Sequence, residues 1–306
     1  MRILVTGATG LIGKRLVKRL AARGEEVVVL SRDAARAEAA LSVKAFAWDS
    51  LAGPPPPPAL AGVEAIIHLA GESVAGGRWT DARKQAIRDS RITGTRNLVA
   101  GIAALEEKSR PRVLVSASAV GWYGDRPGDP VDESAPAGSD FLATVVQGWE
   151  KEAAAAEALG VRVVRVRIGV VVAPPLEGGA LAKMVGPFRM GVGGRTGKGT
   201  QGFPWVHIDD VVGLALHALD NPLVKGPMNA VAPTPVDNRA FAKALGRALH
   251  RPTFLPTPGF AIKLLFGEMA EVLLGGQLVT PRVARETGYS FAHADVDEAL
   301  ADVLPR

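Results

Sequence analysis

The 306-residue chain contains no cysteine and only two tyrosines. The absence of cysteine excludes disulfide bonds, thiolate metal sites and a cysteine nucleophile, and it fits a cytosolic compartment. No stretch approaches the run of about 18 apolar residues that a membrane-spanning helix needs. Met1 leads directly into a strand, without the apolar region of a secretory signal. We therefore expect a cytoplasmic protein with no membrane association and no metal site.

The chain also lacks a concentrated charge of either sign. Its 36 Lys and Arg residues exceed its 31 Asp and Glu residues by five, and the excess is spread along the sequence. Without a basic tract we expect no nucleic-acid partner. An anionic cofactor would be compatible with the small positive net charge. The length and the 47% of apolar residues allow one large α/β domain, or one domain with a smaller lobe.

Three glycines spaced G-x-x-G-x-x-G follow the first apolar strand, at residues 2–6. Gly7 allows a tight turn, Gly10 lets the backbone approach a pyrophosphate, and Gly13 lets the next helix pack closely on a sheet. The first N–H groups of that helix, residues 11 to about 22, would face the phosphates. An ordinary strand-turn-helix is the alternative. We predict a dinucleotide site that includes Gly7, Thr9, Gly10, Leu11, Ile12 and Gly13.

The residues after the second strand, 26–30, indicate which dinucleotide binds. Arg32, with Ser31 beside it, matches the 2′-phosphate of NADP, because a guanidinium presents paired donors to phosphate oxygens. Asp33 is close enough to be the acid that binds the ribose of NAD, and Arg32 alone could be a solvated surface residue. We favour NADP(H) as the cofactor.

Two further strands continue the α/β pattern, at 43–48 and 65–70. The second is apolar nearly throughout, as expected for a strand buried on both faces, and we interpret His68 within it as a core residue. Five prolines at 54–58 predict a stiff extended loop. A polar helix is expected at 81–104, with most of its basic residues facing water, although one could turn toward the phosphates. The remaining predicted cofactor residues are Asp49, Leu69, Ala70, Gly71 and Arg91.

A fifth strand, 112–115, leads into a serine-rich strand end and then Tyr123-Gly124. With the glycine turn, this pattern resembles the extended short-chain dehydrogenases/reductases of the epimerase/dehydratase branch, and more narrowly their epimerase-family oxidoreductases of unassigned substrate. That resemblance implies a doubly wound parallel Rossmann sheet with a smaller C-terminal substrate lobe, and an oxidoreductase or epimerase for a small polar substrate. It rests also on His-Leu-Ala-Gly-Glu at 68–72, Trp79, Lys84, Ser90-Arg91, Phe-Pro-Trp-Val-His-Ile-Asp-Asp at 203–210 and Gly-Gly-Gln-x-Val-x-Pro at 275–281.

The Tyr-x-x-x-Lys pair of that superfamily is missing. Its expected positions in a helix at 140–159 hold Leu142 and Val146, and neither can transfer a proton. Ser118 matches the serine that polarises the substrate, although a serine can simply end a strand. Tyr123 and Glu72 are candidates for the proton donor or acceptor, with loop packing and a solvated carboxylate as the alternatives. A non-catalytic module that senses NADP(H) is the second function considered.

The resemblance divides the chain into a Rossmann domain, 1–172 plus 205–226, and a substrate lobe, 173–204 plus 227–306. Related nucleotide-sugar epimerases hold a diphosphate with an arginine where this chain has Phe203; Arg189, Arg195 and Lys198 remain to bind an anion. We expect His207 to order its loop and the two acids after it to cap a helix. We interpret the segment 260–274 as a core helix, with a lid or a subunit contact as the alternatives. The chain could be a monomer or a homodimer.

Overall fold

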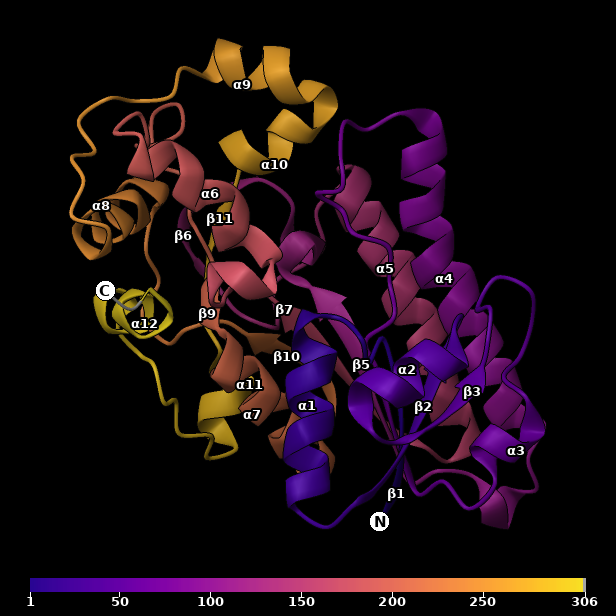
Figure 1. The fold of residues 1–306 in the computed structure, drawn as a ribbon. Coiled ribbons are helices and arrows are strands. Elements are labelled where there is room, and N and C mark those ends of the chain that lie inside the picture. The colour runs from indigo at the N-terminus through magenta and orange to yellow at the C-terminus, as the bar shows by residue number, and fades with distance from the viewer. Residues whose placement is uncertain (305–306) are drawn as a thin grey trace.

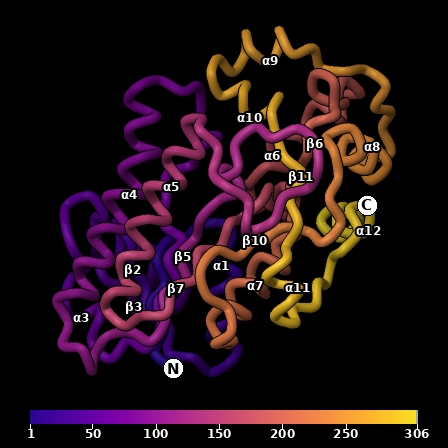
Figure 2. The backbone as a smooth tube through the Cα atoms, turned by 180° about the vertical axis from the view of Figure 1, so that it is seen from behind, coloured from indigo at the N-terminus to yellow at the C-terminus, as the bar shows by residue number. Residues whose placement is uncertain are grey.

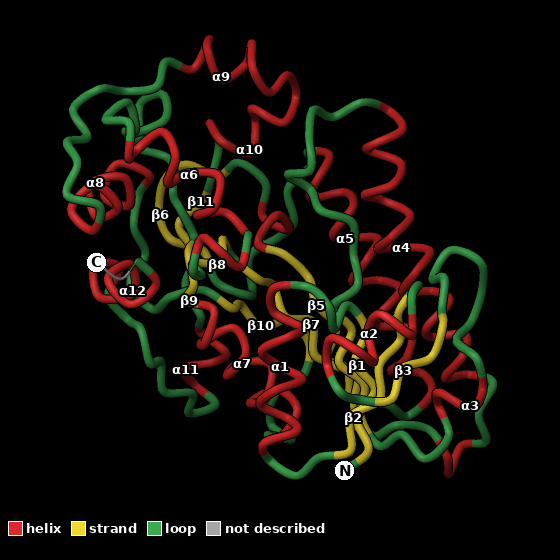
Figure 3. Tube along the Cα trace, in the orientation of Figure 1, coloured by secondary structure: helices red, strands yellow, loops and turns green. Residues whose placement is uncertain are grey.

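The computed structural model describes residues 1–304 and contains one main sheet of seven parallel strands (Figures 1 and 3). Its strands are β1 (Arg2–Thr6), β2 (Glu26–Ser31), β3 (Lys44–Ala47), β4 (Ala65–His68), β5 (Val113–Ala119), β7 (Arg162–Ile168) and β10 (Gly226–Ala230). Their order is β10-β7-β5-β4-β1-β2-β3. The chain reverses its direction across the sheet between β1 and β4, and ligands of such sheets bind beyond the carboxyl ends of the strands at that point.

Helices cover both faces of the sheet because successive strand residues point to opposite sides. Ile3 and Val5 of β1 pack with α1 and α7, whereas Leu4 between them packs with α3, α4 and α5. Figure 1 shows these two layers on either side of the sheet. The helices are α1 (Leu11–Ala22), α2 (Ala34–Leu41), α3 (Pro57–Leu60), α4 (Asp81–Ala103), α5 (Phe141–Ala154) and α7 (Ile208–Asp220). The predicted doubly wound Rossmann sheet is confirmed.

A smaller lobe joins segments that are distant in sequence around a core of its own. Figure 2 shows these parts together, on the far side of β10 from the N-terminus. It contains the paired strands β8 (Val170–Val172) and β9 (Trp205–His207), the paired strands β6 (Arg126–Val131) and β11 (Gln277–Val279), and the helices α6 (Gly179–Arg189), α8 (Asn238–Ala248), α9 (Gly259–Phe266), α10 (Ala270–Leu274) and α12 (Val296–Val303).

Several elements cross the expected domain limits. The strands β6, β8 and β9, which were expected in the Rossmann domain, pair outside the main sheet. Residues 227–230 belong to β10 and so to the main sheet, and α11 (Arg282–Glu286) buries Ala284 in the main core. The expected strand 163–171 is two strands, β7 and β8, because the chain changes partner at Gly169. Its N–H bonds the β10 residue Ala230, and the next N–H, that of Val170, bonds Pro204. The lobe therefore begins at this change of partner.

The proline run is only partly extended. Pro57 and Pro58 form the first turn of α3, where a proline N–H is not needed, while Pro56 keeps an extended backbone. Pro55 is buried against Gly101 of α4. The run therefore anchors α3 to the sheet face that α4 covers. Short 3₁₀ helices complete the described chain at Glu107–Ser109, Val120–Tyr123, Ala155–Leu159, Pro175–Glu177 and Gly267–Met269.

Candidate functional site

The glycine turn lies at the carboxyl end of β1 and has no room for side chains. Gly7 has φ +67°, and a Cβ on it would lie 2.6 Å from the Leu69 carbonyl carbon. A Cβ on Gly13 would collide with the Gly7 carbonyl oxygen and lie 2.6 Å from the Ala8 Cα. The turn therefore brings β1, the start of α1 and the end of β4 into backbone contact. This close approach is what a dinucleotide pyrophosphate requires.

The first turn of α1 offers free N–H groups at this point. Gly10 is the N-cap residue, and no side chain of the described residues caps the helix. Thr9, Leu11 and Ile12 surround this helix start, as predicted. An uncapped N-terminus with its positive dipole end is a ready site for phosphate. The turn therefore fits the diphosphate of a dinucleotide cofactor.

The polar residues after β2 have distinct roles. Asp33 caps α2, because its Oδ1 accepts a hydrogen bond from the Arg36 N–H at 2.9 Å. Ser31 Oγ accepts from the Asp33 N–H at 3.3 Å. Arg32 is exposed, and no carboxylate oxygen of residues 1–304 lies within 4.0 Å of its guanidinium. One oxygen of Asp33 is therefore used in the helix cap, and binding of a 2′-phosphate by Arg32 stays a prediction.

The end of β4 is fixed to β1 by His68. Its Nδ1 lies 2.7 Å from Thr6 Oγ1, and its Nε2 lies 2.9 Å from Thr95 Oγ1 of α4. Thr6 Oγ1 also accepts from the Ala70 N–H, which holds Leu69 and Ala70 beside Gly7. Burial lowers the pKa of His68 to about 4. His68 is thus a neutral core residue, as predicted, and it sets the shape of the cofactor turn.

This burial makes stability depend on pH. Unfolded His68 titrates near 6.5 and folded His68 near 4, so the unfolded chain binds more protons between these values. The contribution of His68 is therefore complete above pH 6.5 and falls by about 3 kcal/mol as the pH drops to 4. Urea unfolding at pH 7 and pH 4.5 should show this loss in the wild type and a smaller loss in His68→Asn. An equal loss in both proteins would contradict the assignment.

Arg91 holds the loop that follows β4. Its Nη1 donates to the Glu72 carbonyl at 2.9 Å, and its guanidinium lies beside Gly71 and 5.2 Å from the Trp149 ring centroid. Burial lowers the pKa of Arg91 to about 10. The Glu72 carboxylate forms an ion pair with Arg83 at 3.0 Å. Arg91 thus holds the loop after β4 through the Glu72 carbonyl. The Glu72 side chain is engaged in its ion pair with Arg83.

Asp49 lies two residues after β3, the edge strand beside β2. Its Oδ1 accepts from the Leu51 N–H at 3.0 Å and fixes the turn after the strand. The residue is exposed. Its contact with the adenine half of a cofactor stays a prediction.

Ser118, near the end of β5, donates to a buried carboxylate. Its Oγ lies 2.6 Å from Glu150 Oε1 of α5. Arg167 of β7 binds the same carboxylate through two hydrogen bonds, from Nε at 2.8 Å and from Nη2 at 3.0 Å. All three side chains are at least 97% buried. Because its proton is directed to Glu150, the Ser118 hydroxyl presents only lone pairs to a further partner.

Tyr123 belongs to the same network. Its hydroxyl accepts from Arg167 Nη1 at 3.1 Å and donates to Asn229 Oδ1 at 2.7 Å, and the side chain is buried. Burial raises the pKa of Tyr123 above its ordinary value. The Arg167 guanidinium also lies 4.0 Å from the Trp122 ring centroid. These contacts favour the packing alternative for Tyr123, which holds Arg167 in place.

An apolar surface occupies the place of the missing Tyr-Lys pair. A Cβ on Gly121, in the 3₁₀ helix after β5, would lie 3.5 Å from Leu142 Cβ and 3.8 Å from Val146 Cγ2. Both residues lie on the side of α5 that faces the Ser118 strand end. Their equivalence to the superfamily's Tyr-Lys pair stays a prediction, and the sequence did not reveal Glu150 and Arg167. The signal in α5 was a glutamate at a core position, but the signal in β7 was ambiguous because that strand holds three arginines.

The substrate lobe offers little to a diphosphate at the position of Phe203. That ring packs on Phe241, with centroids 4.1 Å apart. Arg195, a predicted anion ligand, donates to the carbonyls of Gly197 and Lys198 at 2.7 and 2.9 Å. Arg195 therefore orders its own loop. Anion binding by Arg189 and Lys198 stays a prediction.

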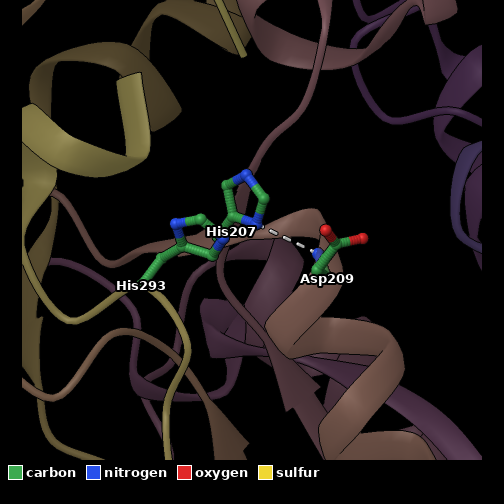
Figure 4. A group of neighbouring side chains, drawn as sticks. All are labelled: His207, Asp209 and His293. Carbon is green, nitrogen blue, oxygen red and sulfur yellow. Dashed lines mark hydrogen bonds between the residues drawn. The ribbon is translucent and has the colours of Figure 1, made fainter. Parts of the chain in front are cut away.

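Three potential metal ligands, His207, Asp209 and His293, meet at the start of α7 (Figure 4). His207 Nδ1 accepts from the Asp209 N–H at 3.2 Å, so His207 caps the helix and the expected capping by the acids is wrong. The centroids of the two imidazole rings lie 3.6 Å apart, with the ring planes tilted by 34°. The Asp209 carboxylate forms an ion pair with Arg15 at 2.9 Å, so this potential ligand already has a partner.

Asp210, the second of these acids, has a different task. It is buried, and its carboxylate accepts from the N–H groups of Ala292 and His293 and from the Tyr289 hydroxyl. The cluster therefore ties the chain before α12 to the start of α7. It positions the C-terminal part of the lobe.

The sequence profile of the NAD dependent epimerase/dehydratase family matches residues 3–230, which include the glycine turn, the Ser118 strand end and the whole main sheet. The chain belongs to this family. A second profile, that of a domain of unknown function (DUF1731), matches residues 257–303. The family assignment agrees with the resemblance inferred from the motifs, and the second match covers the C-terminal part of the lobe.

Relatives match this chain over nearly its whole length. The chain is 42% identical to the Arabidopsis thaliana protein named "Epimerase family protein SDR39U1 homolog, chloroplastic", over 99% of this chain and 87% of that one. It is 37% identical to the Bacillus subtilis epimerase family protein YfhF, over 99% and 98%. Human epimerase family protein SDR39U1 (isoform 2), crystallised with NADPH, superposes with a TM-score of 0.85 at 34% identity over 99% of both chains.

The compartment stays a prediction. Among residues 1–304, no helix has the length and apolar character needed to cross a membrane. One relative is named as chloroplastic. The predicted cytoplasmic location is therefore not established by these comparisons.

Proposed function

We propose that this chain is an NADP(H)-dependent oxidoreductase or epimerase that acts on a small polar substrate beside Ser118. The observation that carries the proposal is the uncapped start of α1 beside a free Arg32, with the neighbouring acid, Asp33, engaged in a helix cap. The crystal structure of human SDR39U1 with NADPH supports the same cofactor. Ser118 lies near the carboxyl end of β5, in the half of the sheet that begins at β4. The nicotinamide end of a dinucleotide would extend toward this half.

The chain would bind the cofactor through few groups. The free N–H groups at the start of α1 would hold the diphosphate, and Arg32 would hold the 2′-phosphate. The nicotinamide supplies hydride transfer when the cofactor is bound. Leu142 and Val146 would exclude water from the substrate beside it. Glu72 remains a candidate base, paired with Arg83.

Ser118 would orient the substrate as a hydrogen-bond acceptor. A substrate hydroxyl can donate to its lone pairs, since the Ser118 proton is directed to Glu150. In alcohol oxidation the substrate hydroxyl proton would pass to Ser118 Oγ and the Ser118 proton to Glu150 Oε1. Carbonyl reduction would start from protonated Glu150, whose proton would pass to Ser118 Oγ while the Ser118 proton passes to the carbonyl oxygen. No tyrosine is needed in either direction.

The Arg32 assignment predicts cofactor preference. Tryptophan fluorescence titration should give a smaller dissociation constant for NADPH than for NADH. Arg32→Ala should weaken NADPH binding by about 1–3 kcal/mol, the value of a charge-assisted hydrogen bond, and leave NADH nearly unchanged. Arg112→Ala serves as the control. Arg112 is exposed and lies just before β5, at the amino ends of the strands, whereas Arg32 lies at their carboxyl ends. Equal affinities for the two cofactors would overturn the assignment.

A non-catalytic NADP(H) sensor is the second candidate. The observation that favours it is the apolar pair Leu142 and Val146 where a proton-transferring pair stands in related enzymes. A sensor would bind NADPH as tightly as the enzyme would, so binding does not separate the two. Hydride transfer to a carbonyl compound does.

A further inference from the structure

The helices α9 and α10 carry large apolar side chains outward, at the end of the molecule opposite the N-terminus (Figures 1 and 2). We call this the α9–α10 surface. Phe260 is 77% exposed and Leu264, one turn later, is 75% exposed. The other members are Leu265, Phe266, Val272 and Leu273, which are 36–64% exposed.

These helices are anchored, so the exposure is not a sign of loose packing. Ile262 of α9 and Met269, which lies between the two helices, are buried. Met269 packs in a cluster with Trp79, Ile87 and Val145 of the main domain. Arg78 Nη2 also donates to the Leu264 carbonyl at 3.1 Å. The side of α9 and α10 that faces the main domain is therefore packed, whereas their outer side exposes apolar side chains to solvent.

The exposed area matches what a stable dimer buries. A fully exposed side chain of this size offers about 150–200 Å², so the six residues together expose on the order of 600 Å². The largest apolar patch on a typical monomer is about 300–600 Å², often functional. A standard interface buries about 800 Å² from each partner, of which about 65% is apolar in homodimers. The exposed apolar area of the α9–α10 surface is therefore about as large as the apolar area that one partner buries in a standard homodimer interface.

The charges on the surface complement one another. Lys263 of α9 and Glu271 of α10 lie among these apolar residues, and neither has an oppositely charged group within 4.0 Å in the described part of the chain. Across a two-fold axis each contact occurs twice, so a pair between Lys263 of one copy and Glu271 of the other would contribute two ion pairs. An anionic membrane would attract Lys263 but repel Glu271, and the nearby Glu268 carboxylate is paired with Lys84.

We propose that a second copy of this chain covers the α9–α10 surface and that the protein is a two-fold dimer. Phe260 and Leu264 form the apolar centre of the interface. Lys263 and Glu271 pair between the copies and fix their register. This proposal does not depend on the reaction that the protein catalyses.

Sedimentation velocity of the full chain at micromolar concentration tests the dimer. The wild type should sediment at twice the chain mass. The variant Phe260→Glu/Leu264→Glu should sediment as a monomer, because four carboxylates would be buried at a two-fold interface. Leu176→Glu is the matched control, since Leu176 is fully exposed outside this surface and its variant should remain dimeric. NADPH titration of each variant checks that it is folded.

Charge reversal provides a test that leaves the apolar centre intact. Lys263→Glu and Glu271→Lys should each raise the dimer dissociation constant about tenfold, and the double variant should restore it. A monomeric wild type, a dimer that survives Phe260→Glu/Leu264→Glu, or two charge reversals whose effects merely add would each overturn the proposal. A monomer that floats with anionic phospholipid vesicles would assign the surface to a membrane instead.

Discussion

Arg167→Met should lower the free energy of unfolding by about 3–5 kcal/mol, because it leaves the buried Glu150 carboxylate without a counter-charge. Glu150 accepts two hydrogen bonds from Arg167 and one from Ser118, and both members of the pair are almost fully buried. The variant also removes the donor to the Tyr123 hydroxyl. Urea denaturation at pH 7, followed by circular dichroism, measures the loss.

Two comparisons isolate the cause. Glu150→Leu/Arg167→Met removes both charges and should recover much of the stability, since the desolvation cost of the charges also disappears. Arg165→Met changes a partly exposed arginine of the same strand, 4.0 Å from the Glu150 carboxylate, and should cost less than about 1 kcal/mol. Equal losses for Arg167→Met and Arg165→Met would show that Glu150 does not depend on Arg167.

Gly13→Ala should abolish tight NADPH binding. The new Cβ would collide with the Gly7 carbonyl oxygen and lie 2.6 Å from the Ala8 Cα, and these backbone atoms cannot move without opening the turn. α1 must then shift away from β1, which displaces the N–H groups that face the phosphates. We expect the dissociation constant to rise at least about 100-fold, or roughly 3 kcal/mol. Fluorescence titration with NADPH measures it.

Gly186→Ala is the matched control for this substitution. Gly186 lies within α6, and no atom lies within 4 Å of an added Cβ. Alanine favours a helix over glycine by about 1 kcal/mol, so this variant should be at least as stable as the wild type. Wild-type affinity in Gly13→Ala would contradict the close packing of the turn.

Much of the main sheet could be predicted from the sequence because its signals are local. Apolar strands such as Leu4 to Thr6 end at glycines that only a tight turn explains, and the places of Leu142 and Val146 followed from motif spacing. The strand β6 gave no such signal, because its sequence holds two prolines and a glycine and it pairs only with the distant β11.

The site was predictable at its cofactor end and less so at its chemical end. Gly7, Gly10 and Gly13 act through local backbone geometry, which the spacing specifies. The roles of Asp33 and Asp210 were less certain, because an acid near a helix start can cap it, bind a ligand or hold a distant segment. Glu150 and Arg167 meet only after α5 packs on β7, so no local pattern joins them.

The central claim is that the chain transfers hydride to or from a substrate beside Ser118 without a Tyr-Lys pair. The most direct test incubates the protein with NADPH deuterated at C4 and a panel of carbonyl compounds, and measures deuterium in the alcohol products by mass spectrometry. The account predicts deuterium transfer by the wild type, at a rate that Ser118→Ala lowers about 10²–10⁴-fold while the NADPH dissociation constant stays unchanged. Tight NADPH binding without deuterium in any product, or an undiminished rate in Ser118→Ala, would contradict it.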